Sequence, residues 1–189
     1  MTIKDAINDA TLFIGKPELS KLKPITESGA NPTADQQADL DLLVRAFNLV
    51  YREISANYVP LLHKQKVTFS ENKLGLDQLE KPLTQIKSLT NADGRRVKYQ
   101  LYPTHIEAKT QDAEIVYAYL PENIAIDSNT PVYAGQILPE VIAYGMAREY
   151  FLIIGDYADS DLWASRYQGA IRLAIAQKRD KVLPARKYR

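Results

Sequence analysis

The chain has 189 residues, which suits one full domain and is short for two. Its hydrophobic fraction of 46% and charged fraction of 25% exclude a wholly disordered protein. The absence of cysteine excludes disulfides, thiolate metal sites and cysteine nucleophiles. No apolar run approaches the roughly 18 residues of a membrane span, and no signal-peptide pattern opens the chain. We therefore expect neither a membrane partner nor export.

The net charge of +1 conceals an uneven distribution of charge. The last twelve residues, 178–189, carry six basic side chains against Asp180 alone, so the rest of the chain is mildly acidic. A basic segment of this length either remains solvated or docks onto a negative surface. Apolar residues such as Leu183 and Tyr188 interrupt the charges, which favours a docking peptide over a purely electrostatic arm.

The N-terminal part of the chain predicts a short helix followed by a loop. Thr2 can cap an amphipathic helix, and Gly15 is a typical C-terminal stop. Residues 16–34 are rich in Pro, Ser, Lys and Gly, and we expect them to form a loop or linker. Residues 1–34 are therefore interpreted as an N-terminal helix and a Pro-rich loop.

A long helix is predicted next. Thr33 and Gln36 have the spacing of a capping box. Apolar residues then recur at helical spacing from Leu40 to Tyr58. Pro60 ends the pattern, because proline is not tolerated inside a helix.

The hydrophobic period then changes to that of β-strands. Two hairpins are predicted: one joins residues 83–89 to 97–101, and the other joins residues 106–108 to 115–120. Turn-forming residues separate the two members of each pair. We expect residues 61–130 to form a small antiparallel β insert.

The helical period returns after the β insert. Apolar residues line one side of a helix over residues 139–154, and Gly155 follows as its stop. A last helix is expected to open at Asp159 or Ser160 and to run to about Lys181. The two helices are close enough in sequence to form a hairpin.

Gly145 and Gly169 lie inside these two helices, where each costs about 0.8–1 kcal/mol relative to alanine. A close approach of the helix axes would offset that cost, so we predict a tight hairpin with close packing at both glycines. Residues 35–60 and 131–181 would form a helical core, and residues 182–189 a C-terminal docking tail. The expected fold class is α+β, a mainly α-helical bundle with an antiparallel β-sheet insertion and an extended basic C-terminal tail.

The sequence contains no recognisable catalytic or metal-binding motif. His63 and His105 have no partner at ligand spacing. Three aspartates superficially resemble part of a calcium loop: Asp156, Asp159 and Asp161. The later Gly and bidentate Glu of such a loop are missing, and a helix cap explains Asp159. Glu140 and Glu149 are expected on a solvated helix face, so we predict no cofactor, no metal and no enzymatic activity.

Tyrosine is abundant, with twelve residues against four phenylalanines and one tryptophan. Such amphipathic aromatic side chains are favoured at subunit interfaces. Five tyrosines lie in or just after the β insert: Tyr99, Tyr102, Tyr117, Tyr119 and Tyr133. Those that face outward are interface candidates, and the alternative is that they pack the β insert.

Several short signals follow one another along residues 35–189. They are a capped amphipathic helix, Tyr-Gln-Leu-Tyr-Pro (99–103), Ile-Val-Tyr-Ala-Tyr-Leu-Pro (115–121), Leu-Pro-Glu-Val-Ile-Ala-Tyr-Gly-Met-Ala-Arg-Glu-Tyr (138–150), Gly-Asp (155–156), Trp-Ala-Ser-Arg-Tyr (163–167) and Pro-Ala-Arg-Lys-Tyr-Arg (184–189). This series resembles the head–tail connector, or adaptor, proteins of tailed bacteriophages and prophages. It includes no catalytic motif.

The resemblance implies a structural protein of the virion, at the head–tail interface and assembled in the host cytoplasm. Such proteins form a homo-oligomeric ring, commonly dodecameric, beneath the portal protein. The ring extends the channel through which genomic DNA passes and offers a platform to the next neck or tail protein. Their C-terminal segment often inserts into the portal. Here the portal-docking residues would be Lys178, Arg179, Lys181, Leu183, Arg186, Lys187, Tyr188 and Arg189.

Three alternatives stay open. The first is a nucleic-acid-binding module that uses the basic C-terminal tail on phosphates, with affinity for DNA that falls steeply with salt. The second is another tail-completion or stopper protein. The third is a small enzyme with a polar pocket that converges on Glu140, Glu149 or His105. In the adaptor interpretation DNA passes the mildly acidic body without specific binding, because a strongly basic lumen would retain the duplex.

Overall fold

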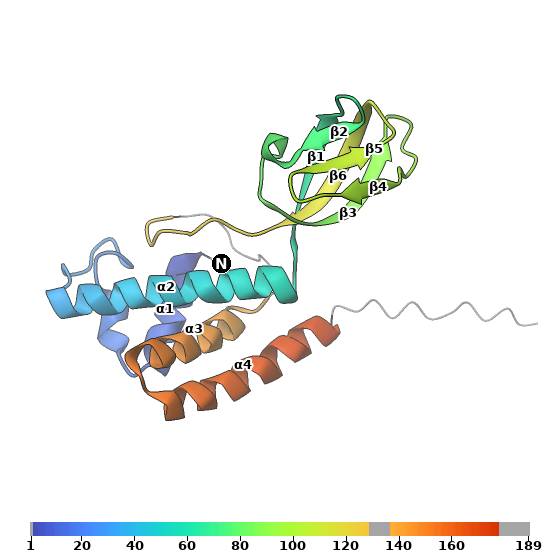
Figure 1. Cartoon of the computed structure of the whole chain (residues 1–189). Coiled ribbons are helices and arrows are strands. Elements are labelled where there is room, and N and C mark those ends of the chain that lie inside the picture. The colour runs from blue at the N-terminus through green and yellow to red at the C-terminus, as the bar shows by residue number, and fades with distance from the viewer. Residues whose placement is uncertain (1, 129–136, 178–189) are drawn as a thin grey trace, which may run out of the picture. The chain divides into compact units, whose positions relative to one another are not determined.

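The computed structural model describes residues 2–128 and 137–177 of the chain. Within these ranges it has four α-helices and two small antiparallel sheets, so the fold is mixed α+β (Figure 1). The chain divides into two compact units, one formed by Met1–Tyr51 with Asn123–Arg189 and the other by Arg52–Glu122. We call the first the helical unit and the second the β unit.

Helix α1 (Ile3–Phe13) begins at a capping box, as Thr2 predicts. The Asp5 N–H donates to Thr2 Oγ1 at 3.4 Å, and the Thr2 N–H donates to the Asp5 carboxylate at 2.7 Å. Gly15 follows with φ of +72°, a left-handed conformation that suits glycine at a helix end. The expected loop after it contains a 3₁₀ helix, η1 (Pro17–Lys21), which the sequence pattern does not predict.

Helix α2 (Ala34–Asn57) also has the predicted capping box. The Thr33 N–H donates to Gln36 Oε1 at 2.9 Å, and the Gln36 N–H donates to Thr33 Oγ1 at 3.4 Å. The apolar side chains at helical spacing are buried: Leu40, Leu43, Phe47, Val50 and Ile54. The boundary between the two units lies within α2, after Tyr51.

Helix α4 (Tyr157–Gln177) begins earlier than the sequence predicts. The Asp159 N–H donates to Asp156 Oδ1 at 3.2 Å, so Asp156 is the capping residue. The expected start of α4 at Asp159 or Ser160 is therefore wrong. Several nearby aspartates could each cap a helix, and in the folded chain the first of them, Asp156, is the one that does so. The predicted end of this helix near Lys181 lies outside the described residues.

Helices α1 and α4 both pack against α3 (Pro139–Ile154), which ends at Gly155 with φ of +87° as predicted. Three aromatic rings connect these helices. The Phe13 ring centroid lies 5.1 Å from that of Tyr144 and 4.9 Å from that of Trp163.

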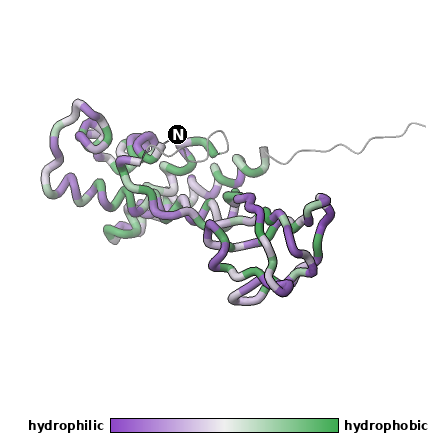
Figure 2. Tube along the Cα trace, turned by 90° about the horizontal axis from the view of Figure 1, so that it is seen from above, coloured by the Kyte–Doolittle hydropathy of each residue, from purple (hydrophilic) through white to green (hydrophobic). Residues whose placement is uncertain are grey.

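Hydrophilic and hydrophobic residues alternate along the helices (Figure 2). In the ranges that the structure describes, no helix is both long and apolar enough to cross a bilayer.

The two helical glycines have different surroundings. A Cβ atom on Gly145 would lie 2.8 Å from Val50 Cγ1 of α2 and 3.1 Å from Tyr167 Cε2 of α4, so neighbouring helices approach Gly145 closely. A Cβ atom on Gly169 would meet no atom within 4 Å. The prediction of close packing at Gly169 is therefore wrong within this chain, because Gly169 lies on an exposed side of α4.

The β unit contains six strands: β1 (Leu61–Thr68), β2 (Lys73–Gly75), β3 (Leu83–Asn91), β4 (Tyr99–Leu101), β5 (His105–Ala108) and β6 (Asp112–Tyr119). One sheet has the order β1-β6-β3, and the other has the order β2-β5-β4. A short 3₁₀ helix, η2 (Leu76–Gln78), follows β2. Apolar side chains of both sheets form one core, which includes Val67, Leu74, Leu89, Ile106, Ile115 and Tyr117.

The second predicted hairpin does not form, and the first forms only next to its turn. There the Asn91 N–H donates to the Arg95 carbonyl and the Val97 N–H donates to the Leu89 carbonyl, both at 2.9 Å. Beyond these residues β3 pairs with β6, and β4 pairs with β5. Strand β5 pairs with β2 and β4 but not with β6. Strand β6 is the most apolar strand and takes the central position of its sheet, where both of its edges are paired. Of the consecutive strands only β4 and β5 pair with each other, and every other strand is followed by one of the other sheet, which local alternation does not reveal.

Candidate functional site

The histidines of the β unit each pair with one carboxylate. His63 Nε2 lies 2.8 Å from Glu80 Oε2, and His105 Nε2 lies 3.3 Å from Glu107 Oε1. A metal site needs three or more such ligands at one point. Within residues 2–128 and 137–177, no group of three or more potential side-chain ligands is assembled.

Two glutamates of α3 are the acid–base candidates of the helical unit. Glu149 forms an ion pair with Arg148, and their side chains are only 15% and 17% exposed. The prediction that Glu149 lies on a solvated helix face is therefore wrong. Glu140 is exposed in the first turn of α3, about 13 Å away along the helix axis. The two carboxylates do not converge.

A partly buried polar network joins three segments of the helical unit. The Tyr150 hydroxyl donates to Asp39 Oδ1 at 2.7 Å, and Lys16 Nζ donates to Asp39 Oδ2 at 2.6 Å. Burial raises the pKa of the Tyr150 hydroxyl, and the hydrogen bond to Asp39 raises the pKa of the Lys16 ammonium. Each oxygen of the Asp39 carboxylate accepts a hydrogen bond from a different segment, which indicates a structural role.

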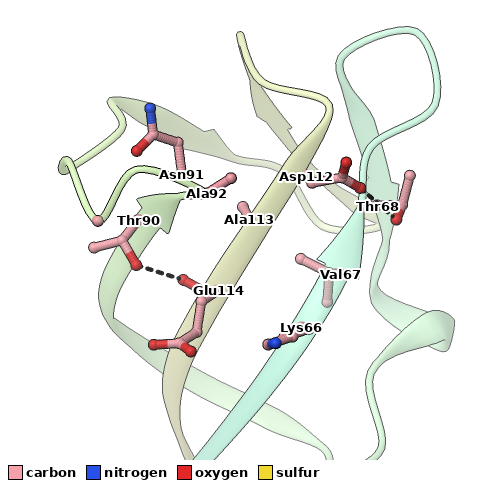
Figure 3. A pocket seen from close by; sticks show the side chains of 10 residues that line it. Lys66, Val67, Thr68, Thr90, Asn91, Ala92, Asp112, Ala113 and Glu114 are labelled. Carbon is pink, nitrogen blue, oxygen red and sulfur yellow. Dashed lines mark hydrogen bonds between the residues drawn. The ribbon is translucent and has the colours of Figure 1, made fainter.

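The β unit has a pocket of about 510 Å³ at one end of the β1-β6-β3 sheet (Figure 3). Its lining residues are Lys66, Val67, Thr68, Thr90, Asn91, Ala92, Gly94, Asp112, Ala113 and Glu114. The Thr68 hydroxyl donates to Asp112 Oδ1 at 2.9 Å, and the Thr90 hydroxyl donates to the Glu114 carbonyl at 3.3 Å. None of the three residues expected at an enzyme site lines it: His105, Glu140 and Glu149.

Many large apolar side chains of the helical unit are exposed. They belong to all four helices and their ends: Leu12, Leu49, Leu138, Leu152, Ile154, Tyr157, Leu162 and Leu173. Single exposed leucines are ordinary in a monomer, whereas several on one surface are typical of a protein–protein interface. The exposed apolar side chains make the surface of the helical unit a candidate for contact with another protein chain.

The β unit carries a cationic loop that the sequence analysis missed, formed by Arg95, Arg96 and Lys98. All three side chains are exposed, and in the described part of the chain none pairs with a carboxylate. Exposed Tyr99 and Tyr102 follow them directly. The net charge of the whole β insert does not reveal this cluster, because the numbers of basic and acidic residues in the insert are equal.

The tyrosine candidates separate into buried and exposed residues. Tyr117 is fully buried, and its hydroxyl donates to Gln65 Oε1 at 3.2 Å, so it belongs to the core. Tyr119 is half-buried, whereas Tyr99 and Tyr102 are 39% and 38% exposed. Tyr133 lies outside the described residues, as do all the portal-docking candidates: Lys178, Arg179, Lys181, Leu183, Arg186, Lys187, Tyr188 and Arg189.

The sequence matches no family model and no curated protein.

Proposed function

We propose that this protein is a head–tail adaptor of a tailed bacteriophage, whose copies form a ring between the portal and the neck or tail. The observation that carries the proposal is the number of large apolar side chains exposed on the helical unit, including Leu12, Leu138 and Leu173 at 61–65%. Such surfaces suit packing against other protein chains.

In this proposal the helical unit forms the bundle that makes up the ring, and residues 178–189 form an extended basic tail. The tail combines six cations with Leu183 and Tyr188. Cations would form charge-assisted hydrogen bonds with carboxylates of the portal, and the apolar side chains would enter pockets between them. The protein would act at the head–tail interface of the virion, after assembly in the host cytoplasm, and without enzymatic activity.

The β unit supplies a surface for the neck or tail protein. Strand β4 pairs with β5 along one edge only, and Leu101 of β4 is 49% exposed. An unprotected edge strand can accept a strand of another protein.

The decisive experiment combines the full chain with the portal of the same phage. Mass photometry and cryo-EM of the mixture are expected to show rings on the portal. Deletion of residues 182–189 should leave the circular dichroism spectrum unchanged and abolish portal binding. If the truncated chain still binds the portal, the docking role of the tail is refuted. If the full chain does not bind the portal, the adaptor function is refuted.

Nucleic-acid binding is a second candidate function, favoured by the cationic loop of the β unit. Arg95, Arg96 and Lys98 would contact phosphates, and Tyr99 or Tyr102 would stack on bases of a single strand. Within the chain, the Tyr102 ring already stacks on another flat ring: it lies parallel to the His105 ring, with centroids 4.7 Å apart. The charged tail could contribute to the same binding.

Binding of single-stranded and duplex DNA, titrated with salt, separates the two functions. A nucleic-acid-binding module should bind at physiological salt and lose most of its affinity when Arg95, Arg96 and Lys98 are changed to alanine. An adaptor should bind DNA weakly at that salt, with no preference among these variants. Substitution of Lys64, Lys73 and Lys81, which pair with carboxylates, is the charge-matched control.

A further inference from the structure

Helix α4 presents apolar or small side chains on two opposite faces. The buried face consists of Ser160, Trp163, Tyr167 and Ile171. The opposite, exposed face consists of Ala158, Leu162, Ser165, Gly169, Leu173 and Ala176. At about 100° per residue, these six positions fall within an arc of about 80°. We call this face the α4 stripe; its Leu162 and Leu173 are 50% and 65% exposed.

Gly169 lies near the middle of the α4 stripe. Glycine inside a helix lowers stability, and at Gly145 the close approach of Val50 explains why it is present. At Gly169 no neighbour within the described chain supplies such a reason. A helix of another molecule could approach the α4 backbone closely at this point, between Leu162 and Leu173.

Charged residues border the α4 stripe on both sides: Asp159 and Asp161 beside its first turn, and two arginines beside its longer part from Leu162 onward. Between Leu162 and Ala176 the charged residues are Arg166 and Arg172, and helical geometry places one on each side of the stripe. Both are exposed, and neither pairs with a carboxylate in the part of the chain that the structure describes. A matching surface should therefore combine exposed apolar side chains with carboxylates.

The helical unit contains such a surface at α1 and the start of α3. Leu12 and Leu138 are 61% and 62% exposed there. Asp5, Asp9 and Glu140 provide carboxylates, and their mutual repulsion adds to burial in raising the pKa of Asp9. The spacing of Asp5, Asp9 and Leu12 places them on one face of α1, and Asp9 lies within electrostatic range of both Asp5 and Glu140. We call these five residues the acidic face.

We propose that the α4 stripe of one copy packs against the acidic face of the next copy, with Arg166 and Arg172 beside its carboxylates. The α4 stripe belongs to α4, and the acidic face belongs to α1 and the start of α3, so the two surfaces share no residue. Two different surfaces in contact make a head-to-tail interface, which closes into a ring when the rotation is suitable. This inference rests on the proposed adaptor function and specifies how its ring is held together.

Charge exchange between two variants tests the pairing. R166E/R172E gives the stripe negative charge, and D9K/E140K gives the acidic face positive charge. Each variant alone brings like charges together and should assemble at least ten-fold more weakly than the natural chain. An equimolar mixture should recover assembly, because each stripe then meets an opposite charge on the other variant. Circular dichroism verifies the fold of each variant.

Assembly is measured by mass photometry of the full chain, alone and with the portal. If both variants assemble like the natural chain, or if the folded variants do not recover assembly when mixed, the pairing is overturned while the adaptor function stands. If the natural chain forms no ring under either condition, the adaptor function fails and this inference fails with it.

Disulfide trapping gives an independent readout, because the chain has no cysteine of its own. A mixture of G169C and L12C chains should form a covalent dimer under mild oxidation, since a disulfide needs Cα atoms about 4.4–6.8 Å apart. The control mixture pairs G169C with L62C, whose position in the β unit is also exposed. Equal yields of mixed dimer in the two reactions would overturn the proposed contact.

Discussion

Tyr150 of α3 and Asp39 of α2 are joined by a hydrogen bond of 2.7 Å, although 111 residues separate them in sequence. The ammonium group of Lys16 contacts the second oxygen, Oδ2, of the same Asp39 carboxylate. The carboxylate therefore fixes the segment after α1, the first turns of α2 and the last turn of α3 in one arrangement. Its contribution to stability can be measured by removing one partner at a time.

Tyr150→Phe removes only the hydroxyl that donates to Asp39. Because Tyr150 is 2% exposed and the acceptor is charged, we expect a loss of about 1–2 kcal/mol in the free energy of unfolding, measured by urea denaturation. Tyr157→Phe is the matched control, since Tyr157 is 67% exposed, and it should change stability by less than about 0.5 kcal/mol. Equal effects of the two substitutions would contradict the structural role of the network.

The same network predicts a loss of stability at alkaline pH. The pKa values of Tyr150 and Lys16 are both raised in the folded state, so folding favours their protonated forms. Their contribution is complete below about pH 10, the ordinary pKa range of tyrosine and lysine, and is lost as pH rises through the folded-state values. Urea denaturation from pH 8 to 11 should show this decline, and Tyr150→Phe should make it smaller.

Asp9→Asn is expected to stabilise the dilute, unassembled protein near neutral pH. Burial, Glu140 and Asp5 raise the pKa of Asp9, so the charged form is disfavoured by folding. The natural chain therefore loses stability as pH rises from below 3.8, the ordinary value, through the folded-state pKa of Asp9. The two proteins should differ less at pH 3 than at pH 7, and a constant difference would contradict this account.

Alanine substitutions at the two helical glycines should have opposite effects. Gly145→Ala gains about 0.8–1 kcal/mol of helix propensity but forces contact with Val50, whose branched side chain is held in one rotamer, and overpacking costs about 1–3 kcal/mol. Gly169→Ala meets no atom and should stabilise the monomer by about 0.8–1 kcal/mol. Chemical denaturation of both variants checks the sign of each change.

Local patterns were sufficient to predict the four α-helices, the starts of α1 and α2 and the end of α3. The capping boxes at Thr2 and Thr33 each involve residues three positions apart, and Gly155 ends α3 through its own backbone conformation. The change of period after Pro60 was likewise enough to predict a β region. These features depend on hydrogen bonds and sterics within a few residues, so they can be recognised without knowledge of the fold.

Partners distant in sequence were decided only by tertiary packing. Strand β6 is hydrogen-bonded to β1 along one edge and to β3 along the other, and this separates β3 from β4 and β5 from β6. Asp156 rather than Asp159 caps α4, and Val50 of α2 explains Gly145. Each outcome depends on which segments contact one another in the folded chain. The spacing of apolar residues in the sequence shows which face of an element is buried, but it does not show which element covers that face. The partner of the exposed α4 stripe cannot be predicted from the sequence of α4 either, because the proposed partner surface belongs to another copy of the chain.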